Sequence, residues 1–147
     1  MRAVVAAAAL LALLAFAAPA ETATMRPARA AGLTVSSSPF GQILFDHRIR
    51  ALYIFTKDGK GSSRCYGDCA AAWPPYIVKS KPRALAGAKP SLIGTVKRSD
   101  GTLQVTYAGR PVYFYRGDTQ PHQVLCQNVY EYGGLWLVVR GNGTPVR

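Results

Sequence analysis

The chain has 147 residues, of which 18 are Lys or Arg and 7 are Asp or Glu, and its formal net charge is +11. This length suits one domain with a core large enough to fold without obligatory disulfides or metals. The few acids and 2 histidines leave little material for a general acid–base site. The sequence also contains no G-x-S-x-G, P-loop, G-x-G-x-x-G or H-E-x-x-H pattern, so it favours a non-catalytic protein.

The N-terminal residues 1–20 have the features of a secretory signal peptide. Arg2 supplies positive charge, residues 3–18 are apolar, and residues 18–20 form the cleavage motif A-P-A. The apolar stretch is shorter than the ~20 residues that a membrane span needs. We therefore expect a periplasmic or secreted protein whose mature chain has no transmembrane span. A second motif, A-R-A at residues 28–30, leaves the cleavage position open.

The chain from residue 21 to residue 78 is expected to pass from a flexible lead into the first half of a β domain. Residues 21–39 are rich in Ala, Thr, Ser and Pro without an apolar period, so we expect order to begin near Phe40. Residues 43–45 and 52–55 are strand-like, and the second run stops at Asp58. A short helix is predicted near Asp68–Trp73, with Asp68 as its N-cap and prolines at 74 and 75 as its end.

Residues 79–99 are interpreted as an exposed basic linker, because they contain Pro and Gly and no acid. The second half, residues 100–140, begins with a hairpin. Residues 103–107 alternate, residues 108–111 turn, and residues 112–115 return, while residues 136–139 predict a further strand. The linker cations are Lys79, Lys81, Arg83, Lys89, Lys97 and Arg98.

The two halves, residues 40–78 and 100–140, are copies of one unit. When Gly41 is placed on Gly101, the two segments align without a gap through Asp58 and Asp118. Trp73 pairs with Trp136 if the second copy carries three extra residues. Two copies are too few for a solenoid. We therefore predict a single, mainly β domain over residues 40–147, with antiparallel sheets built from two pseudo-symmetric repeats and one short helix.

Each repeat carries the motif Tyr-x-aromatic-x-x-Asp, which supplies candidate binding residues. Residues i and i+2 of a strand share a face, so two copies bring four rings to a shared core or groove. One interpretation is that these rings are core aromatics and each Asp closes its strand through an Asx-type turn. The other is a stacking surface for sugar rings or flat ligands. Turn chemistry explains the carboxylates more simply than glycoside hydrolysis does. The residues are Tyr53, Phe55, Asp58, Tyr113, Tyr115 and Asp118.

Three cysteines and one histidine form a possible metal set. Cys65-x3-Cys69 and His122-x3-Cys126 together offer three thiolates and one imidazole, which is a ligand set for zinc or copper. Oxidation to a disulfide competes with metal binding outside the cytoplasm. The other histidine, His47, aligns with a tyrosine of the second copy and is interpreted as a sheet residue.

Residues 52–58, 65–75 and 93–107 together resemble a bacterial secreted-repeat family of predicted lipoproteins with the Tyr-x-(Phe/Trp/Tyr)-x-x-Asp motif. The resemblance spans roughly residues 40–140, and C-Y-G-D-C-A-A-A-W-P-P is its most specific segment. It implies an envelope location and no mechanism. It also favours a Cys65–Cys69 disulfide, because both cysteines belong to that segment, although pairing of either with Cys126 stays open. The lipoprotein Cys is lacking, and residues 121–126 replace a loop that is usually rich in Gly and Asn.

The sequence thus predicts an exported, non-catalytic envelope module that binds an anionic or carbohydrate partner. Besides the aromatic motif, the candidate binding residues are Lys79, Lys81 and Arg83, and the partner would be an anionic envelope polymer or an acidic protein. Nucleic acid is not expected for an exported chain, and no cofactor is expected. The alternative is a metal-binding or thiol-redox protein of the periplasm that uses Cys65, Cys69, His122 and Cys126.

Overall fold

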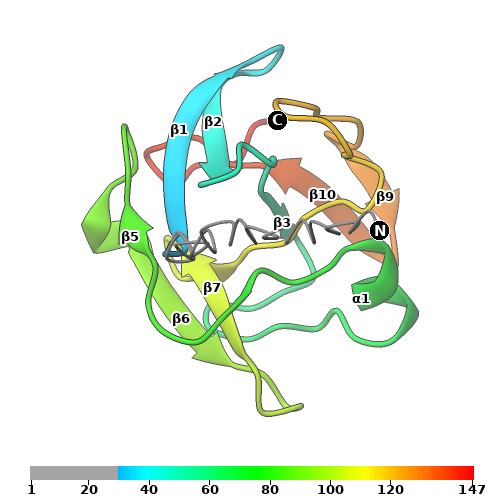
Figure 1. The fold of residues 1–147 in the computed structure, drawn as a ribbon. Helices are drawn as coiled ribbons and strands as arrows, with labels where there is room; N and C mark the ends of the chain where they lie inside the picture. Colours follow the sequence, from blue (N-terminus) through cyan, green and yellow to red (C-terminus); the bar gives the residue numbers. More distant parts are fainter. Residues whose placement is uncertain (1–29) are drawn as a thin grey trace, which may run out of the picture.

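Short strands dominate the computed structural model, which describes residues 30–147 and is shown in Figure 1. The expected signal peptide and residues 21–29 of the expected lead lie outside this part of the chain. The mainly β fold with one short α-helix confirms the predicted fold class. The elements are β1 (Gly32–Ser38), β2 (Gly41–Asp46), β3 (Tyr53–Phe55), α1 (Asp68–Ala72), β4 (Ile77–Val78), β5 (Arg83–Ala84), the 3₁₀ turn η1 (Pro90–Leu92), β6 (Ile93–Lys97), β7 (Leu103–Tyr107), β8 (Arg110–Pro111), β9 (Val129–Glu131) and β10 (Gly134–Val138).

The strands form three small sheets. One has the order β2-β1-β5, in which β1 and β2 are antiparallel and β5 joins β1 in parallel. The second has the order β3-β10-β9, and the third has the order β4-β7-β6 with β8 also paired to β7. Every pairing in the second and third sheets is antiparallel. Apart from the short parallel pair of β1 and β5, the sheets therefore agree with the antiparallel arrangement expected from the sequence.

Each repeat begins earlier than the sequence predicts. The lead interpretation is wrong from Gly32 onward, because residues 32–38 form β1, which pairs with β2 along six residue pairs. The linker interpretation, residues 79–99, is wrong in two places, because residues 83–84 form β5, which pairs with β1, and residues 93–97 form β6, which pairs with β7. Strands β1 and β6 are rich in Ser, Thr, Gly or Lys, so composition alone hides them. Leu33 is nevertheless fully buried, and its burial against the core anchors β1.

The two repeats exchange their last strands. β4, which follows Trp73 of the first repeat, pairs with β7 of the second. The chain that follows Trp136 of the second repeat returns to the first, where Arg140 bridges to Ile43 of β2. In the same way, β10 of the second repeat pairs with β3 of the first. Each repeat therefore completes a sheet of the other, and neither can satisfy its backbone hydrogen bonds alone.

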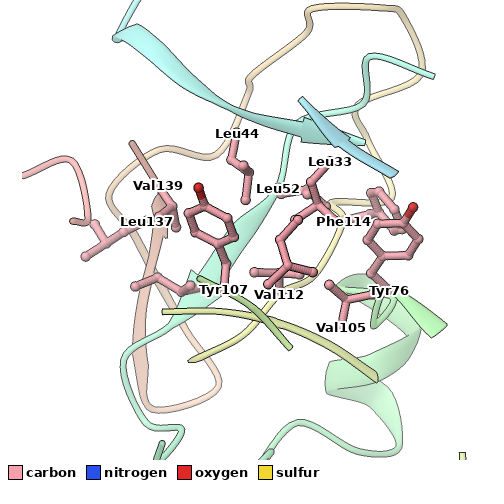
Figure 2. Packing of buried hydrophobic residues seen from close by; sticks show 12 residues of the cluster. Leu33, Leu44, Leu52, Tyr76, Val105, Tyr107, Val112, Phe114, Leu137 and Val139 are labelled. Carbon is pink, nitrogen blue, oxygen red and sulfur yellow. The ribbon is translucent and has the colours of Figure 1, made fainter. Parts of the chain in front are cut away.

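The exchange produces a core that both repeats share. Figure 2 shows side chains of the first repeat, Leu44 and Leu52, gathered with Tyr107 and Val112 of the second. All four side chains are completely buried. Full burial of one such apolar side chain contributes ~1.5–3 kcal/mol, so packing between the repeats is a major source of stability.

The helix forms where the sequence predicts it, but its N-cap differs. The structure has α1 at Asp68–Ala72, and the prolines at 74 and 75 follow its C-cap Trp73, as expected. Gly67 is the N-cap, with φ of 56°, and no side chain caps the helix, so the expectation that Asp68 is the cap is wrong. Asp68 instead lies in the first turn, where a negative charge interacts favourably with the helix dipole.

Candidate functional site

Two tyrosines and two aspartates make crossed hydrogen bonds between the repeats. The Tyr53 hydroxyl donates to Asp118 Oδ2 at 2.6 Å, and the Tyr113 hydroxyl donates to Asp58 Oδ2 at 2.7 Å. The backbones of the two tyrosines also exchange two N–H···O bonds, both of 2.9 Å. The motif of each repeat is therefore completed by the motif of the other, around an approximate two-fold axis between the tyrosines.

The second oxygen of each carboxylate holds the loop that follows its own motif. Asp58 Oδ1 accepts the N–H of Arg64 at 2.7 Å, and Asp118 Oδ1 accepts the N–H of Leu125 at 3.0 Å. The expected Asx-type turn is wrong, because such a turn bonds the backbone two residues ahead, whereas these bonds span six and seven residues. Both carboxylate oxygens of each aspartate therefore accept a hydrogen bond, one from the tyrosine of the other repeat and one from the loop of its own repeat.

Burial sets the ionisation of this cluster. It raises the pKa of Asp58 and of Asp118 above the ordinary aspartate value, and the hydrogen bonds from the tyrosines oppose that rise. Burial also raises the pKa of Tyr53 and Tyr113, and the neighbouring carboxylates raise it further. A neutral phenol therefore donates to each buried carboxylate, which is the arrangement that satisfies both groups.

The tryptophans of the two repeats stack on each other within a second cluster of buried side chains, which also contains Tyr53, Phe55 and Tyr113. The ring centroids of Trp73 and Trp136 are 4.0 Å apart with an interplanar angle of 4°, and Phe55 stacks on the other face of Trp136 at 4.3 Å. The two tryptophans that are paired in the alignment of the repeats are thus in direct contact in the structure. Trp73 Nε1 donates to Glu131 Oε2 at 2.9 Å.

The buried motif rings cannot form a surface for sugars. Tyr53 and Tyr113 are 0 % exposed and Phe55 is 1 % exposed, so the structure contradicts the stacking-surface interpretation for these three residues. They are core aromatics whose hydroxyls find partners, which was the other interpretation. Tyr115 is half-buried and lies against Trp73 at a centroid distance of 4.8 Å.

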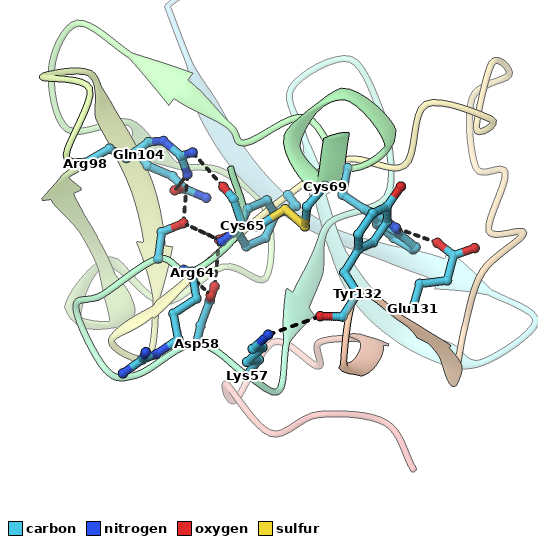
Figure 3. The surroundings of a disulfide bond; sticks show 12 residues. Lys57, Asp58, Arg64, Cys65, Cys69, Arg98, Gln104, Glu131 and Tyr132 are labelled. Atoms are coloured by element: carbon cyan, nitrogen blue, oxygen red, sulfur yellow. Dashed lines mark hydrogen bonds between the residues drawn. A yellow bond between two sulfur atoms is a disulfide. The ribbon is translucent and has the colours of Figure 1, made fainter. Parts of the chain in front are cut away.

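The structure contains the expected Cys65–Cys69 disulfide, with a Cα–Cα distance of 5.3 Å (Figure 3). This bond contradicts the metal set, because neither cysteine retains a thiolate for a metal. Among residues 30–147, no group of three or more His, Cys, Asp or Glu residues is placed to hold a metal ion. His122 is exposed and packs edge-on against Phe45 at 5.4 Å.

Cys126 occupies the position in the second repeat that Cys65 occupies in the first. Each follows directly after the residue whose N–H bonds to the motif aspartate, Arg64 in one repeat and Leu125 in the other. Cys126 is a free, half-buried thiol, and burial raises its pKa. It is therefore a protonated packing residue at neutral pH.

Arg98 is buried, although the sequence places it in an exposed linker. Its guanidinium donates to Ser63 Oγ at 2.8 Å, to Gln104 Oε1 at 2.7 Å and to the Cys65 carbonyl at 2.7 Å (Figure 3). It also lies over the Tyr66 ring at 4.2 Å. Arg98 thus ties the second repeat to the disulfide loop of the first.

The other linker cations are exposed at the surface, whereas several of the acids are buried. Lys79, Lys81 and Arg83 are exposed on the segment that leads from β4 into β5. Three of the described acids are buried, whereas Arg98 is the one buried Lys or Arg among the described residues. No acid lies in the sequence between Asp68 and Asp100. The surface is therefore more basic than composition suggests. The buried acids are Asp46, Asp58 and Asp118.

Two surface pockets accompany these features. The smaller, of about 140 Å³, lies beside Asp118 and is lined partly by Arg50 and Arg116. The larger, of about 320 Å³, is lined by Ala30, Thr34, His47, Ile49, Arg83 and Leu85.

The sheet interpretation of His47 is wrong, because β2 ends at Asp46 and His47 lies in the turn that follows. The sequence signal that could have set His47 apart from a sheet residue is its mismatch with Tyr107, the aligned residue of the other repeat.

Comparison with known proteins identifies one family. The sequence profile of a family described as a secreted repeat of unknown function matches residues 34–76 and 94–140, which confirms the resemblance seen in the sequence. Both matches begin inside the strands that the sequence misses, β1 and β6. No curated protein and no solved structure matches the chain. Within residues 30–147 no helix is long and apolar enough to cross a membrane.

Proposed function

Because the chain belongs to a family of secreted repeats of unknown function, we propose that it is a non-catalytic module of the periplasm or cell exterior whose basic surface binds an anionic envelope polymer or acidic protein. The observation that carries this proposal is the separation of charge by burial. Asp46 is paired with Arg50 at 2.8 Å, and Asp58 and Asp118 are bonded to tyrosines, so none of these three acids pairs with Lys79, Lys81 or Arg83.

The segment from Lys79 to Arg83 is the strongest candidate for contact. Its three cations alternate along a short, exposed connection between two sheets, and no acid is near in sequence. An exposed ion pair contributes ~0–1 kcal/mol, so three together contribute up to ~3 kcal/mol, or about 100-fold in affinity. Binding of this kind weakens as salt shortens the range of the charges.

The test is chromatography of the exported protein on dextran sulfate, with uncharged dextran as the matrix control. We expect retention on the sulfated matrix, elution by moderate salt, and no retention on dextran, because three of the four motif rings, Tyr53, Phe55 and Tyr113, are buried and cannot stack on sugars. The triple variant Lys79→Gln, Lys81→Gln, Arg83→Gln should elute at lower salt than the wild type.

A matched triple variant separates the local site from general charge. Lys60→Gln, Arg64→Gln and Arg147→Gln remove the same charge from other exposed positions and should have a smaller effect. Equal effects of the two triple variants would assign binding to net charge alone. Retention that is unchanged in molar salt, or equal on both matrices, would contradict the electrostatic proposal.

A further inference from the structure

The larger pocket combines one cation with an apolar wall. Arg83 is an exposed residue on β5, Leu85 and Ile49 supply aliphatic surface, and no acid among residues 30–147 lines the pocket. The volume of about 320 Å³ is at the lower end of the range of ligand pockets, which suits a small molecule. A guanidinium offers paired N–H donors that match a carboxylate or a phosphate.

The repeats provide an internal comparison for the turn that forms one side of this pocket. In the second repeat the turn between β7 and β8 is Ala108-Gly109, and both residues have positive φ, as a two-residue hairpin requires. The equivalent of Gly109 in the first repeat is Ile49, which has φ of 62°. A β-branched residue in this conformation is strained. The strain occurs where an Ile side chain lines the pocket, and such outliers are concentrated at functional sites.

The same comparison separates His47 from its equivalent, Tyr107. The Tyr107 hydroxyl donates to the Gly141 carbonyl at 2.7 Å and accepts the N–H of Lys89 at 3.0 Å. Its hydrogen-bonding groups are therefore satisfied within the structure. His47 lines the pocket, and its buried Nδ1 has no hydrogen-bond partner within residues 30–147. Buried polar atoms without a partner are uncommon in folded proteins and call for an explanation. Both departures from the second repeat thus meet at one pocket.

The remaining contacts show that this turn is held firmly. The Asp46 carboxylate accepts the backbone N–H groups of Arg48 and Arg50, each at 2.9 Å, and the Ile49 carbonyl accepts the N–H of His122 at 3.0 Å. The strained backbone is therefore fixed from both sides before any ligand arrives. A pocket wall fixed in advance loses little entropy when a ligand binds.

We propose that this pocket binds a small amphipathic organic anion, whose carboxylate or phosphate pairs with Arg83 while a short aliphatic part lies against Ile49 and Leu85. The imidazole of His47 forms the polar part of the wall beside the anionic group. This inference rests on the proposed function only through Arg83, which belongs to both the pocket and the exposed basic segment.

The test is a titration of the exported protein with hexanoate and with butyl phosphate, followed by NMR chemical shifts. Acetate, inorganic phosphate and 1-butanol are the controls that lack either the aliphatic part or the charge. We expect saturable shifts for at least one of the two amphipathic anions, and at least tenfold weaker binding of the controls. Hexanoate binding without butyl phosphate binding would assign a carboxylate ligand, and the reverse would assign a phosphate ester.

Variants then locate the site. Arg83→Gln should weaken binding of the amphipathic anion at least tenfold. Lys79→Gln, which removes the same charge outside the pocket lining, should leave the affinity unchanged. Ile49→Gly gives the turn the residue found in the second repeat, so it should fold and lose the preference for hexanoate over acetate. His47→Tyr, also copied from the second repeat, should weaken binding as well.

The outcomes separate this inference from the proposed function. Absence of saturable binding of both anions, or equal binding by Arg83→Gln and the wild type, would overturn the pocket assignment. The double variant Lys79→Gln, Lys81→Gln, which keeps Arg83, is tested in both assays, and its loss of retention on dextran sulfate reports on polymer binding alone. Failure of either assay is therefore visible while the other succeeds.

Discussion

Replacing Arg98 by Ala should destabilise the fold far more than a change in a linker would. The side chain of Arg98 is 1 % exposed, and its guanidinium supplies the donors for Ser63, Gln104 and the Cys65 carbonyl. A buried polar group that loses its partner costs ~1–3 kcal/mol, and Arg98→Ala leaves three neutral acceptors without this donor. Removing the buried guanidinium charge offsets part of this cost, so we expect a loss of about 3–5 kcal/mol in the free energy of unfolding. Arg98→Lys keeps the charge but cannot reach all three acceptors, so it should lose about half of that.

The assay is urea denaturation followed by tryptophan fluorescence, with the disulfide intact in every sample. Trp73 and Trp136 are buried at the junction of the repeats, so their emission reports on loss of the shared core. Lys97→Ala is the control, because Lys97 is exposed and should change stability by less than ~0.5 kcal/mol. Equal small effects of Arg98→Ala and Lys97→Ala would refute the assignment of Arg98 as the buried tie between repeats.

Three further predictions follow from burial and strand exchange. Because the pKa of Asp118 is raised in the folded protein, its ionisation lowers stability as pH rises from the usual aspartate range through the raised value. Urea denaturation between pH 4 and pH 7 should therefore show that the free energy of unfolding of Asp118→Asn rises relative to that of the wild type as pH rises. A difference between the two proteins that does not change with pH would contradict this. Replacing Cys65 and Cys69 by Ala should cost ~2 kcal/mol by the entropy of so short a loop, and a denaturation midpoint equal to that of the wild type would count against it. Residues 30–92 and 93–147 produced separately should each lack folded circular dichroism and amide protection, and a folded monomer of either half would refute the exchange.

Much of the fold follows from the sequence because the repeat is strong where side chains are apolar. The alignment of Gly41 with Gly101 identifies the duplicated unit, and the alternation of residues 103–107 identifies β7. The first strand of each repeat is missed because Ser, Thr and Lys occupy its exposed positions. Each of those strands is stabilised by a partner strand and by few buried side chains, such as Leu33 and Ile93, and such tertiary support is invisible in a local pattern.

The site is less predictable than the fold, and the reason is the symmetry of the motif. Two identical motifs place a tyrosine and an aspartate in each repeat, but the sequence does not say whether Tyr53 bonds to Asp58 or to Asp118. An Asx-type turn is the simplest local explanation, and strand exchange overrides it. Arg98 is a related case, because a cation beside other cations resembles a solvated linker unless its acceptors in the other repeat are known.

The most direct test of this architecture is a pair of double-mutant cycles read by urea denaturation. One cycle combines Tyr53→Phe with Asp118→Asn, across the repeats, and the other combines Tyr53→Phe with Asp58→Asn, within one repeat. Residues in direct contact couple by ~0.5–3 kcal/mol, whereas pairs without a shared partner are nearly additive. We predict coupling in the first cycle and additivity in the second. Coupling confined to the second cycle would show that each motif closes on itself and would contradict the exchange between repeats.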